Sequence, residues 1–420
     1  MNAITLIPLC LPLVLSLPGE LETPETGSAD TWPQWRGPSR DGHSEGTTWA
    51  DGLGEEKLVQ TWQVPDLGPS YSGPVVDAKR VYTTEAEDEK YEVVRAFDRD
   101  SGKEVWATRW EGSMEVPFFA ARNGSWIRST PALDENSIYV AGMRDVLKCI
   151  DVASGEVRWT VDFTERYETP LPPFGFVSSP LLDDDHVYVQ AGASLVKLEK
   201  DTGKSVWRSM VEGGDMQSSG AFSSPVFGSI GGVHQLVVQS RTTLAGVSVD
   251  DGSLLWSTPV KAFRGMNILT PTVYGDGVFT SVYGGRTHLF QVDSSDGGQE
   301  VSESWNVPMQ GYMTSPVIVD RHAFLFLKSN RFACVNLETG EKSWTSPPTG
   351  DAYWSIVSQG DRILALSDAG MLRLVKASAD DYEVISERQI VEDETWAPIV
   401  PVGNQLFVRA QGSLIAMEWK

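Results

Sequence analysis

Aromatic and polar side chains recur in the short segments that precede a repeated proline, where together they could bind a ligand or a peptide. An aromatic surface with a few polar groups is typical of such sites, because the rings supply apolar contact area and the polar groups fix orientation. The same aromatics could instead fill the space between neighbouring loops, so a binding role and a packing role both remain open. The candidates for contact with a protein or small ligand are Tyr71, Trp126, Arg128, Phe176, Phe222, Asn267, Tyr312, Tyr353, Trp354 and Trp396.

Residue types that carry catalysis are few, and their spacing matches no known catalytic or metal-binding motif. The sequence has five histidines, and no two of them have the spacing of metal ligands. It contains no glycine-rich phosphate loop, no G-x-S-x-G and no H-E-x-x-H. The acidic run 183–185 falls in a predicted turn, where carboxylates are normally solvated. We therefore predict no catalytic residue and no metal site.

The aromatic segments belong to a repeat that fills most of the chain. Each copy has a small hydroxyl residue before the proline, two alternating apolar strands, an Asp-x-x-Ser/Thr-Gly turn and a tryptophan. Period-2 alternation indicates β-strands, and the spacing of 40 to 57 residues between successive anchors is near that of a propeller blade. Eight copies predict an all-β protein, an eight-bladed β-propeller of four-stranded blades. The anchors are Pro74, Pro131, Pro180, Pro225, Pro271, Pro316, Ile356 and Pro398.

The two ends of the repeat region complement each other. The eighth copy stops after its third strand, and residues 58–64 carry Trp62 in the setting of the other fourth strands. We predict that residues 58–64 close the ring as the outer strand of the last blade, because closure removes an exposed sheet edge. The fourth-strand tryptophans are expected to fill the wedge between twisted blades. Cys149 and Cys334 hold the same position in opposite copies, so both are expected to be buried and unpaired.

Two segments of different character precede the propeller, which we assign to residues 58–420. Residues 1–29 contain an apolar run too short to span a bilayer, followed by a polar linker, which predicts a secretory signal and an exported protein, periplasmic or extracellular. Residues 30–57 are too aromatic for a free linker and are expected to dock on the propeller. The net charge of −23 opposes nucleic-acid binding. We expect a monomer that does not span the membrane.

The repeat resembles that of the PQQ-like (pyrroloquinoline quinone) propeller family, and the resemblance covers residues from about 58 to 420. The segment Trp32–Gly42 (WPQWRGPSRDG) is similar to the N-terminal signature of secreted, BamB-like members from planctomycete-type bacteria. The resemblance implies either an exported, non-catalytic binding scaffold or, as the alternative, a quinoprotein-type oxidoreductase with PQQ and calcium in the central channel. The sequence lacks the adjacent cysteine pair and the long insertions of the dehydrogenases, so we expect a scaffold without a cofactor. Carbohydrate binding by the aromatic segments before the anchors, at one opening of the channel, is a third possibility.

Overall fold

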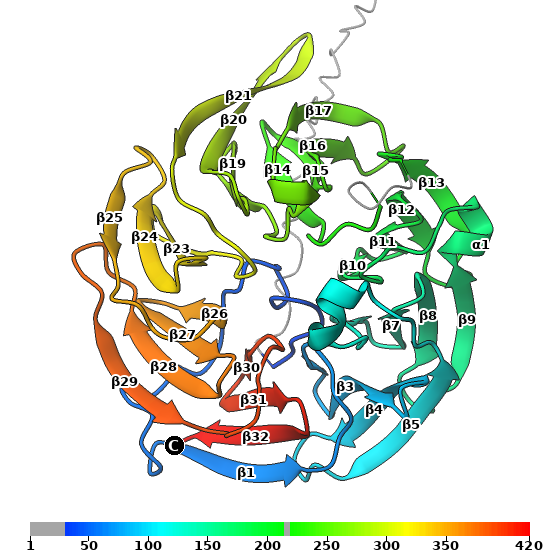
Figure 1. Cartoon of the computed structure of the whole chain (residues 1–420), viewed down its shortest axis with the longest axis vertical. Helices are drawn as coiled ribbons and strands as arrows, with labels where there is room; N and C mark the ends of the chain where they lie inside the picture. The colour runs from blue at the N-terminus through cyan, green and yellow to red at the C-terminus, as the bar shows by residue number, and fades with distance from the viewer. Residues whose placement is uncertain (1–29, 214–218) are drawn as a thin grey trace, which may run out of the picture.

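The computed structural model describes residues 30–213 and 219–420 and shows eight four-stranded antiparallel sheets around a central channel (Figure 1). The predicted secretory signal lies outside the described residues. Each sheet is one blade, and its strands run in sequence order from the innermost to the outermost, except that β1 completes blade 8. The predicted all-β, eight-bladed propeller is confirmed.

The strand bounds follow the repeat copies. Blades 1 to 4 consist of β2 (Val75–Val76), β3 (Arg80–Glu87), β4 (Tyr91–Asp98) and β5 (Glu104–Glu111); β6 (Ala132–Leu133), β7 (Ser137–Gly142), β8 (Val146–Asp151) and β9 (Val157–Asp162); β10 (Leu181–Leu182), β11 (His186–Ala191), β12 (Ser194–Glu199) and β13 (Ser205–Ser209); and β14 (Val226–Ile230), β15 (Val233–Gln239), β16 (Thr243–Ser248) and β17 (Leu254–Pro259). Blades 5 to 8 consist of β18 (Thr272–Tyr274), β19 (Gly277–Ser281), β20 (Thr287–Ser295) and β21 (Gly298–Val307); β22 (Val317–Val319), β23 (His322–Leu327), β24 (Arg331–Asn336) and β25 (Lys342–Thr345); β26 (Trp354–Gln359), β27 (Arg362–Ser367), β28 (Met371–Lys376) and β29 (Val384–Gln389); and β30 (Val400–Val402), β31 (Gln405–Ala410), β32 (Ser413–Trp419) and β1 (Leu58–Val64).

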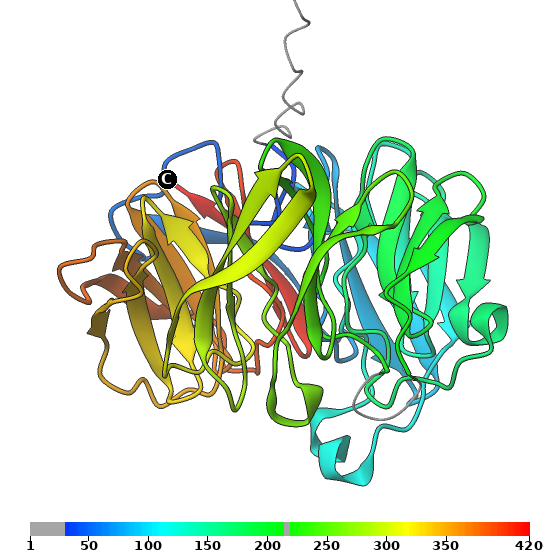
Figure 2. The same ribbon diagram turned by 90° about the horizontal axis from the view of Figure 1, so that it is seen from above.

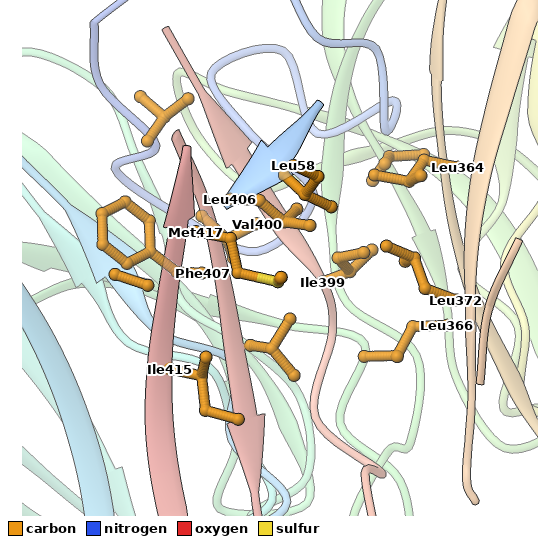
Figure 3. Packing of buried hydrophobic residues seen from close by; sticks show 14 of the residues in the cluster. Leu58, Leu364, Leu366, Leu372, Ile399, Val400, Leu406, Phe407, Ile415 and Met417 are labelled. Atoms are coloured by element: carbon orange, nitrogen blue, oxygen red, sulfur yellow. The ribbon is translucent and has the colours of Figure 1, made fainter. Parts of the chain in front are cut away.

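The N-terminal strand β1 closes the ring by pairing antiparallel with β32, the last strand of the chain. Leu58 lies opposite Trp419, and its buried side chain packs beside Leu406 and Met417 of blade 8 (Figure 3). Leucines of blade 7 belong to the same core, which therefore joins the two ends of the chain to the neighbouring blade. The predicted closure by residues 58–64 is confirmed.

Tryptophans on the outer strands join six of the eight blades to the next. In six blades the indole Nε1 donates a hydrogen bond to a main-chain carbonyl in the turn between the third and fourth strands of the following blade; Trp256 instead donates to Gln235 of its own blade. At five of these six junctions the turn glycine of the following blade lies directly against the indole, so that a Cβ on Gly340 would be 2.7 Å from the ring of Trp305. The six bonds are Trp62 to Arg99, Trp106 to Val152, Trp159 to Lys200, Trp207 to Val249, Trp305 to Leu337 and Trp344 to Ser378.

The seventh repeat has no tryptophan on its outer strand, and the N-terminal segment supplies one at that junction. Trp49 is buried and stacks on Trp419, with ring centroids 6.4 Å apart. Its backbone N–H donates to Gln359 of blade 7, and its carbonyl accepts from Arg362. The segment before β1 thus packs across the junction of blades 7 and 8.

One end of the propeller, here called the mouth face, carries the connections from each outer strand to the next inner strand and the hairpins between second and third strands. Short helices that the sequence pattern did not predict lie in the connections: η1 (Phe118–Asn123), α1 (Phe163–Tyr167) and η2 (Phe263–Gly265). Figure 2 shows η1 and η2 projecting from the mouth face. Within the described ranges, no helix has the length and apolar character needed to cross a bilayer.

Candidate functional site

Residues 32–44 lie in the central channel, which they enter from the end opposite the mouth face (Figures 1 and 2). Trp32 exchanges two backbone hydrogen bonds with Val76 of blade 1, at 2.8 and 2.9 Å. Ser44 donates its backbone N–H to the carbonyl of Ser358 in blade 7 at 2.8 Å. The segment is therefore anchored to inner strands on different sides of the ring.

Two buried arginines extend this anchoring across the channel. Arg36 donates to the carbonyl of Ser315 in blade 6 at 2.7 Å, and Arg40 donates to the carbonyl of Ser179 in blade 3 at 3.1 Å. Burial lowers the pKa of Arg36 to about 10. Burial, together with the nearby positive charge of Arg36, lowers the pKa of Arg40 to about 9. Main-chain carbonyls, not carboxylates, hold both guanidinium groups in place.

The small hydroxyl residue before each anchor proline forms a second joint between blades. In five consecutive junctions it accepts a hydrogen bond from the backbone N–H of the equivalent residue in the preceding blade, at 2.9 to 3.1 Å. All five hydroxyl residues are buried. The sequence signal for this role is the hydroxyl itself, which recurs with the repeat but does not reveal its partner. The pairs are Gly73 with Thr130, Thr130 with Ser179, Ser179 with Ser224, Ser224 with Thr270, and Thr270 with Ser315.

Five of the ten predicted binding residues meet on the mouth face in what we call the aromatic cluster: Tyr71, Trp126, Arg128, Tyr353 and Trp396. The ring of Tyr71 lies 5.1 Å from that of Trp126 and 6.0 Å from that of Trp396. Trp396 in turn stacks on Tyr353, with ring centroids 5.6 Å apart and planes inclined by 15°. These residues come from the connections into blades 1, 2, 7 and 8, and all five are partly exposed.

Arg128 gives the cluster a cationic group without a carboxylate partner among the described residues. Its guanidinium lies over the ring of Tyr71 at 5.2 Å and donates to the carbonyl of Gly124 at 2.8 Å. Its Nε is buried without a hydrogen-bond partner in the described structure, and burial lowers the pKa of the group. A groove of about 780 Å³ adjoins Trp126 and is lined by Glu89, Glu111 and other residues of blades 1 and 2. The cluster therefore offers aromatic rings for stacking, together with a guanidinium group whose Nε has no hydrogen-bond partner in the described structure.

The opposite side of the cluster is acidic. Trp396 donates its Nε1 hydrogen to Glu394 at 2.9 Å, and the backbone N–H of Tyr353 donates to Asp368 at 3.3 Å. Burial raises the pKa of Asp368, and the charge of Glu394 raises it further. Burial also raises the pKa of Tyr353 to about 12, so this phenol stays protonated at neutral pH. The cluster can therefore present charges of both signs to a partner.

Two other predicted residues lie in separate aromatic groups. Phe222 packs edge-on to Phe174 at 5.5 Å, and the guanidinium of Arg241 lies 4.3 Å from its ring. Tyr312 lies 4.9 Å from Tyr283, a residue outside the predicted set because it follows a second strand and does not precede an anchor. The aromatics of the mouth face thus form several groups and not one continuous ring.

Three predicted residues are buried and offer no exposed surface, which corrects their assignment to a binding surface. Phe176 is 2% exposed and packs near Phe163, and Trp354 is fully buried against Phe332. Asn267 is fully buried, and its amide nitrogen donates to two main-chain carbonyls, those of Arg241 and Val260. All three stabilise loops or blades from within.

The repeat sequence matches a known protein family. A family profile described as outer membrane protein assembly factor BamB matches residues 89–346, more than half of the chain. The chain belongs to this family. BamB of Moranella endobia is 21% identical over 361 residues, which cover 82% of this chain and 84% of that protein. BamB of Yersinia pestis is 23% identical over 273 residues, which cover 57% of this chain and 64% of that protein.

Solved structures of the BamB family and of quinoproteins share the fold. BamB from Moraxella catarrhalis superposes with a TM-score of 0.62 at 14% identity, covering 86% of this chain and 98% of that one. The quinohemoprotein alcohol dehydrogenase ADHIIG from Pseudomonas putida HK5 superposes with a TM-score of 0.63 at 12% identity, covering 93% of this chain and 80% of that one. At such identities the likeness shows the propeller fold alone.

Two observations on this BamB-family chain bear on whether the channel could hold a calcium-bound quinone. In residues 30–213 and 219–420 no group of three or more His, Cys, Asp or Glu side chains is arranged to hold a metal ion. The segment that carries Arg36 and Arg40 fills part of the channel in which the cofactor would lie. Cys149 and Cys334 are both buried and free, as predicted.

Proposed function

We propose that this BamB-family propeller is an exported, monomeric, non-catalytic scaffold that binds a partner protein through the aromatic cluster. The main support is one continuous, partly exposed aromatic surface beside Arg128, formed by Tyr71, Trp126, Tyr353 and Trp396. Tryptophan, tyrosine and arginine are enriched among the residues that dominate the energetics of protein interfaces, and the aromatic side chains bury large areas.

Three further observations support this proposal. The relatives in Moranella endobia and Yersinia pestis are named outer membrane protein assembly factors, and a part in assembly implies contact with other proteins. The apolar run in residues 1–29 favours export. The poor fit of the channel to a metal-bound cofactor favours binding over redox catalysis.

A photo-crosslinking experiment can identify the partner and test the surface. A photoreactive residue at position 126 in the full chain, expressed in its host, should capture a defined protein, whereas the same residue at Leu254 should not. Leu254 is a suitable control because it is 54% exposed at the start of the outer strand of blade 4, away from the mouth face.

The partner identified in this way is then purified and its affinity measured. The triple variant Trp126→Ala, Arg128→Gln, Trp396→Ala should weaken binding by at least about 30-fold, since two or three interface hot spots are removed. Leu254→Ala should change the affinity less than about twofold. Equal affinity of the triple variant and the native protein, with equal melting temperatures, would refute the proposal; a preference for an oligosaccharide over the captured protein would favour carbohydrate binding instead.

A further inference from the structure

A groove between blades 5 and 6 runs from the mouth face along the outer strand of blade 6, at a distance from the aromatic cluster in the ring. Its walls are residues 308–310, which follow β21, and residues 327–329 in the hairpin between β23 and β24. Arg331, Lys342 and Thr345 of blade 6 complete the lining of a space of about 630 Å³. We call this space the interblade groove.

The interblade groove is cationic in a protein whose net charge is −23. Lys328, Arg331 and Lys342 line it, and no Asp or Glu does. None of the three cations takes part in an ion pair within the described part of the chain. Lys328 donates to the hydroxyl of Tyr283 at 2.8 Å, and Arg331 donates to the carbonyl of Ser346 at 2.6 Å. A locally positive surface that acidic neighbours do not neutralise favours an anionic ligand.

The register of blade 6 places the polar groups in a line. Thr345 pairs with Ala333 and Lys342 pairs with Val335, so both share one face of the sheet with Arg331. Arg331 and Val335 are four residues apart on β24, a separation of about 13 Å along the strand. Between these ends, the Oγ1 of Thr345 is buried and has no hydrogen-bond partner in the described structure. The groove therefore has an unsatisfied polar atom as well as separated cations.

This spacing distinguishes among anionic ligands. The strand positions of Arg331 and of the residue paired with Lys342 are about 13 Å apart, a span that matches an extended peptide, whose same-side residues follow one another every 6 to 7 Å or so. A single phosphate is only a few ångströms across and would occupy one end of this span. The rings of Tyr283 and Tyr312, 4.9 Å apart, lie beside Lys328 and offer apolar contact at one end. We infer that the interblade groove binds an acidic, extended segment of a protein, with carboxylates at Lys328, Arg331 and Lys342.

The probe for this inference is a fluorescein-labelled decapeptide of alternating Glu and Ser, titrated with the full chain at low salt and followed by fluorescence anisotropy. The double variant Lys328→Glu, Lys342→Glu should bind it at least tenfold more weakly, because two attractions become repulsions. Both lysines are exposed, so the substitution should leave the melting temperature unchanged. The matched control is Lys103→Glu, Lys204→Glu, which makes the same change in net charge at two exposed positions in turns of blades 1 and 3, outside the lining of the groove.

The control should bind within twofold of the native protein, and raising the salt concentration should weaken native binding, since exposed charges are screened. No binding by the native protein, or an equal loss in the control, would overturn the inference. Competition by inorganic phosphate at the same total charge, or preferred binding to phosphatidylglycerol vesicles, would overturn it in favour of an isolated phosphate or a lipid surface. The inference is independent of the aromatic cluster, because the Trp126, Arg128, Trp396 variant should still bind the decapeptide.

Discussion

The contact between Trp305 and Gly340 allows the joint between two blades to be tested by adding a single methyl group. Gly340 has a φ of +73°, and a Cβ there would lie 2.7 Å from the indole of Trp305, whose Nε1 donates to Leu337 at 2.8 Å. Gly340→Ala should cost about 1 kcal/mol for the left-handed backbone and about 1 to 3 kcal/mol for the forced displacement of the ring. We expect the free energy of unfolding to fall by about 2 to 4 kcal/mol in total.

Gly360→Ala is the matched control, because Gly360 also has a positive φ, +54°, but a Cβ added there would meet no atom within 4 Å. This variant should lose only the backbone contribution of about 1 kcal/mol. Urea-induced unfolding followed by circular dichroism gives both values. A second check combines Gly340→Ala with Trp305→Ala, since removing the ring removes the clash and should bring the cost of the Gly340→Ala substitution down to that of the control. Equal destabilisation by Gly340→Ala and Gly360→Ala, or strict additivity in the double variant, would refute the proposed packing of turn against indole.

Two further predictions concern buried polar groups. Thr130→Val removes the hydroxyl that accepts from the backbone N–H of Gly73 at 3.0 Å and should lower the free energy of unfolding by about 1 to 3 kcal/mol, whereas Thr130→Ser should keep most of the stability; equal urea midpoints for the two variants would contradict this role. Glu92 accepts from the backbone of Met143 and from Trp110, and burial raises its pKa to about 7, so the folded state binds more protons than the unfolded state between pH 4.5 and 7. Its contribution to stability should therefore fall by about 3 kcal/mol as the pH rises through this range, and Glu92→Gln should flatten the dependence of the unfolding free energy on pH; an unchanged slope in the variant would show that Glu92 titrates normally.

The architecture was predictable because the sequence contains eight copies of the same blade repeat. Each anchor proline, turn and tryptophan repeats the same local signal, so the blade count did not depend on reading any single copy correctly. The absence of a fourth strand in the last copy and the presence of Trp62 ahead of the first copy fixed the closure by β1 in the same way.

The candidate site was predictable only in part, because its members are not related by the repeat. Tyr71 and Trp396 meet although they are far apart in the sequence, and their contact depends on how individual connections bend. Trp354 precedes an anchor as Trp126 does, yet it begins the inner strand β26 and turns into the core. A pattern of residue types does not specify which way a loop side chain points.

The path of the N-terminal segment through the channel could not be predicted from the sequence either. Arg36 and Arg40 bind main-chain carbonyls, which every residue has, so the partners leave no trace in the residue types. Trp49 fills the junction that lacks its own tryptophan, but the sequence alone could not connect an absence in the seventh copy with a tryptophan more than 300 positions earlier.

The pairing of β1 with β32 has a consequence for the order of folding. Thr61 on β1 bonds to the carbonyl of Ala416, a contact that spans 355 residues of sequence. Hairpins within a blade can form locally and early, whereas this contact carries a large loop-closure entropy and must come late. During synthesis from the N-terminus, β1 remains without its partner β32 until nearly all of the propeller has been made, and the channel segment can contact blades 1 and 3 before blades 6 and 7 exist. The eighth blade is therefore the last to be completed, and until then the outer edge of β32 and the apolar face of β1 are the surfaces most open to mispairing with another chain.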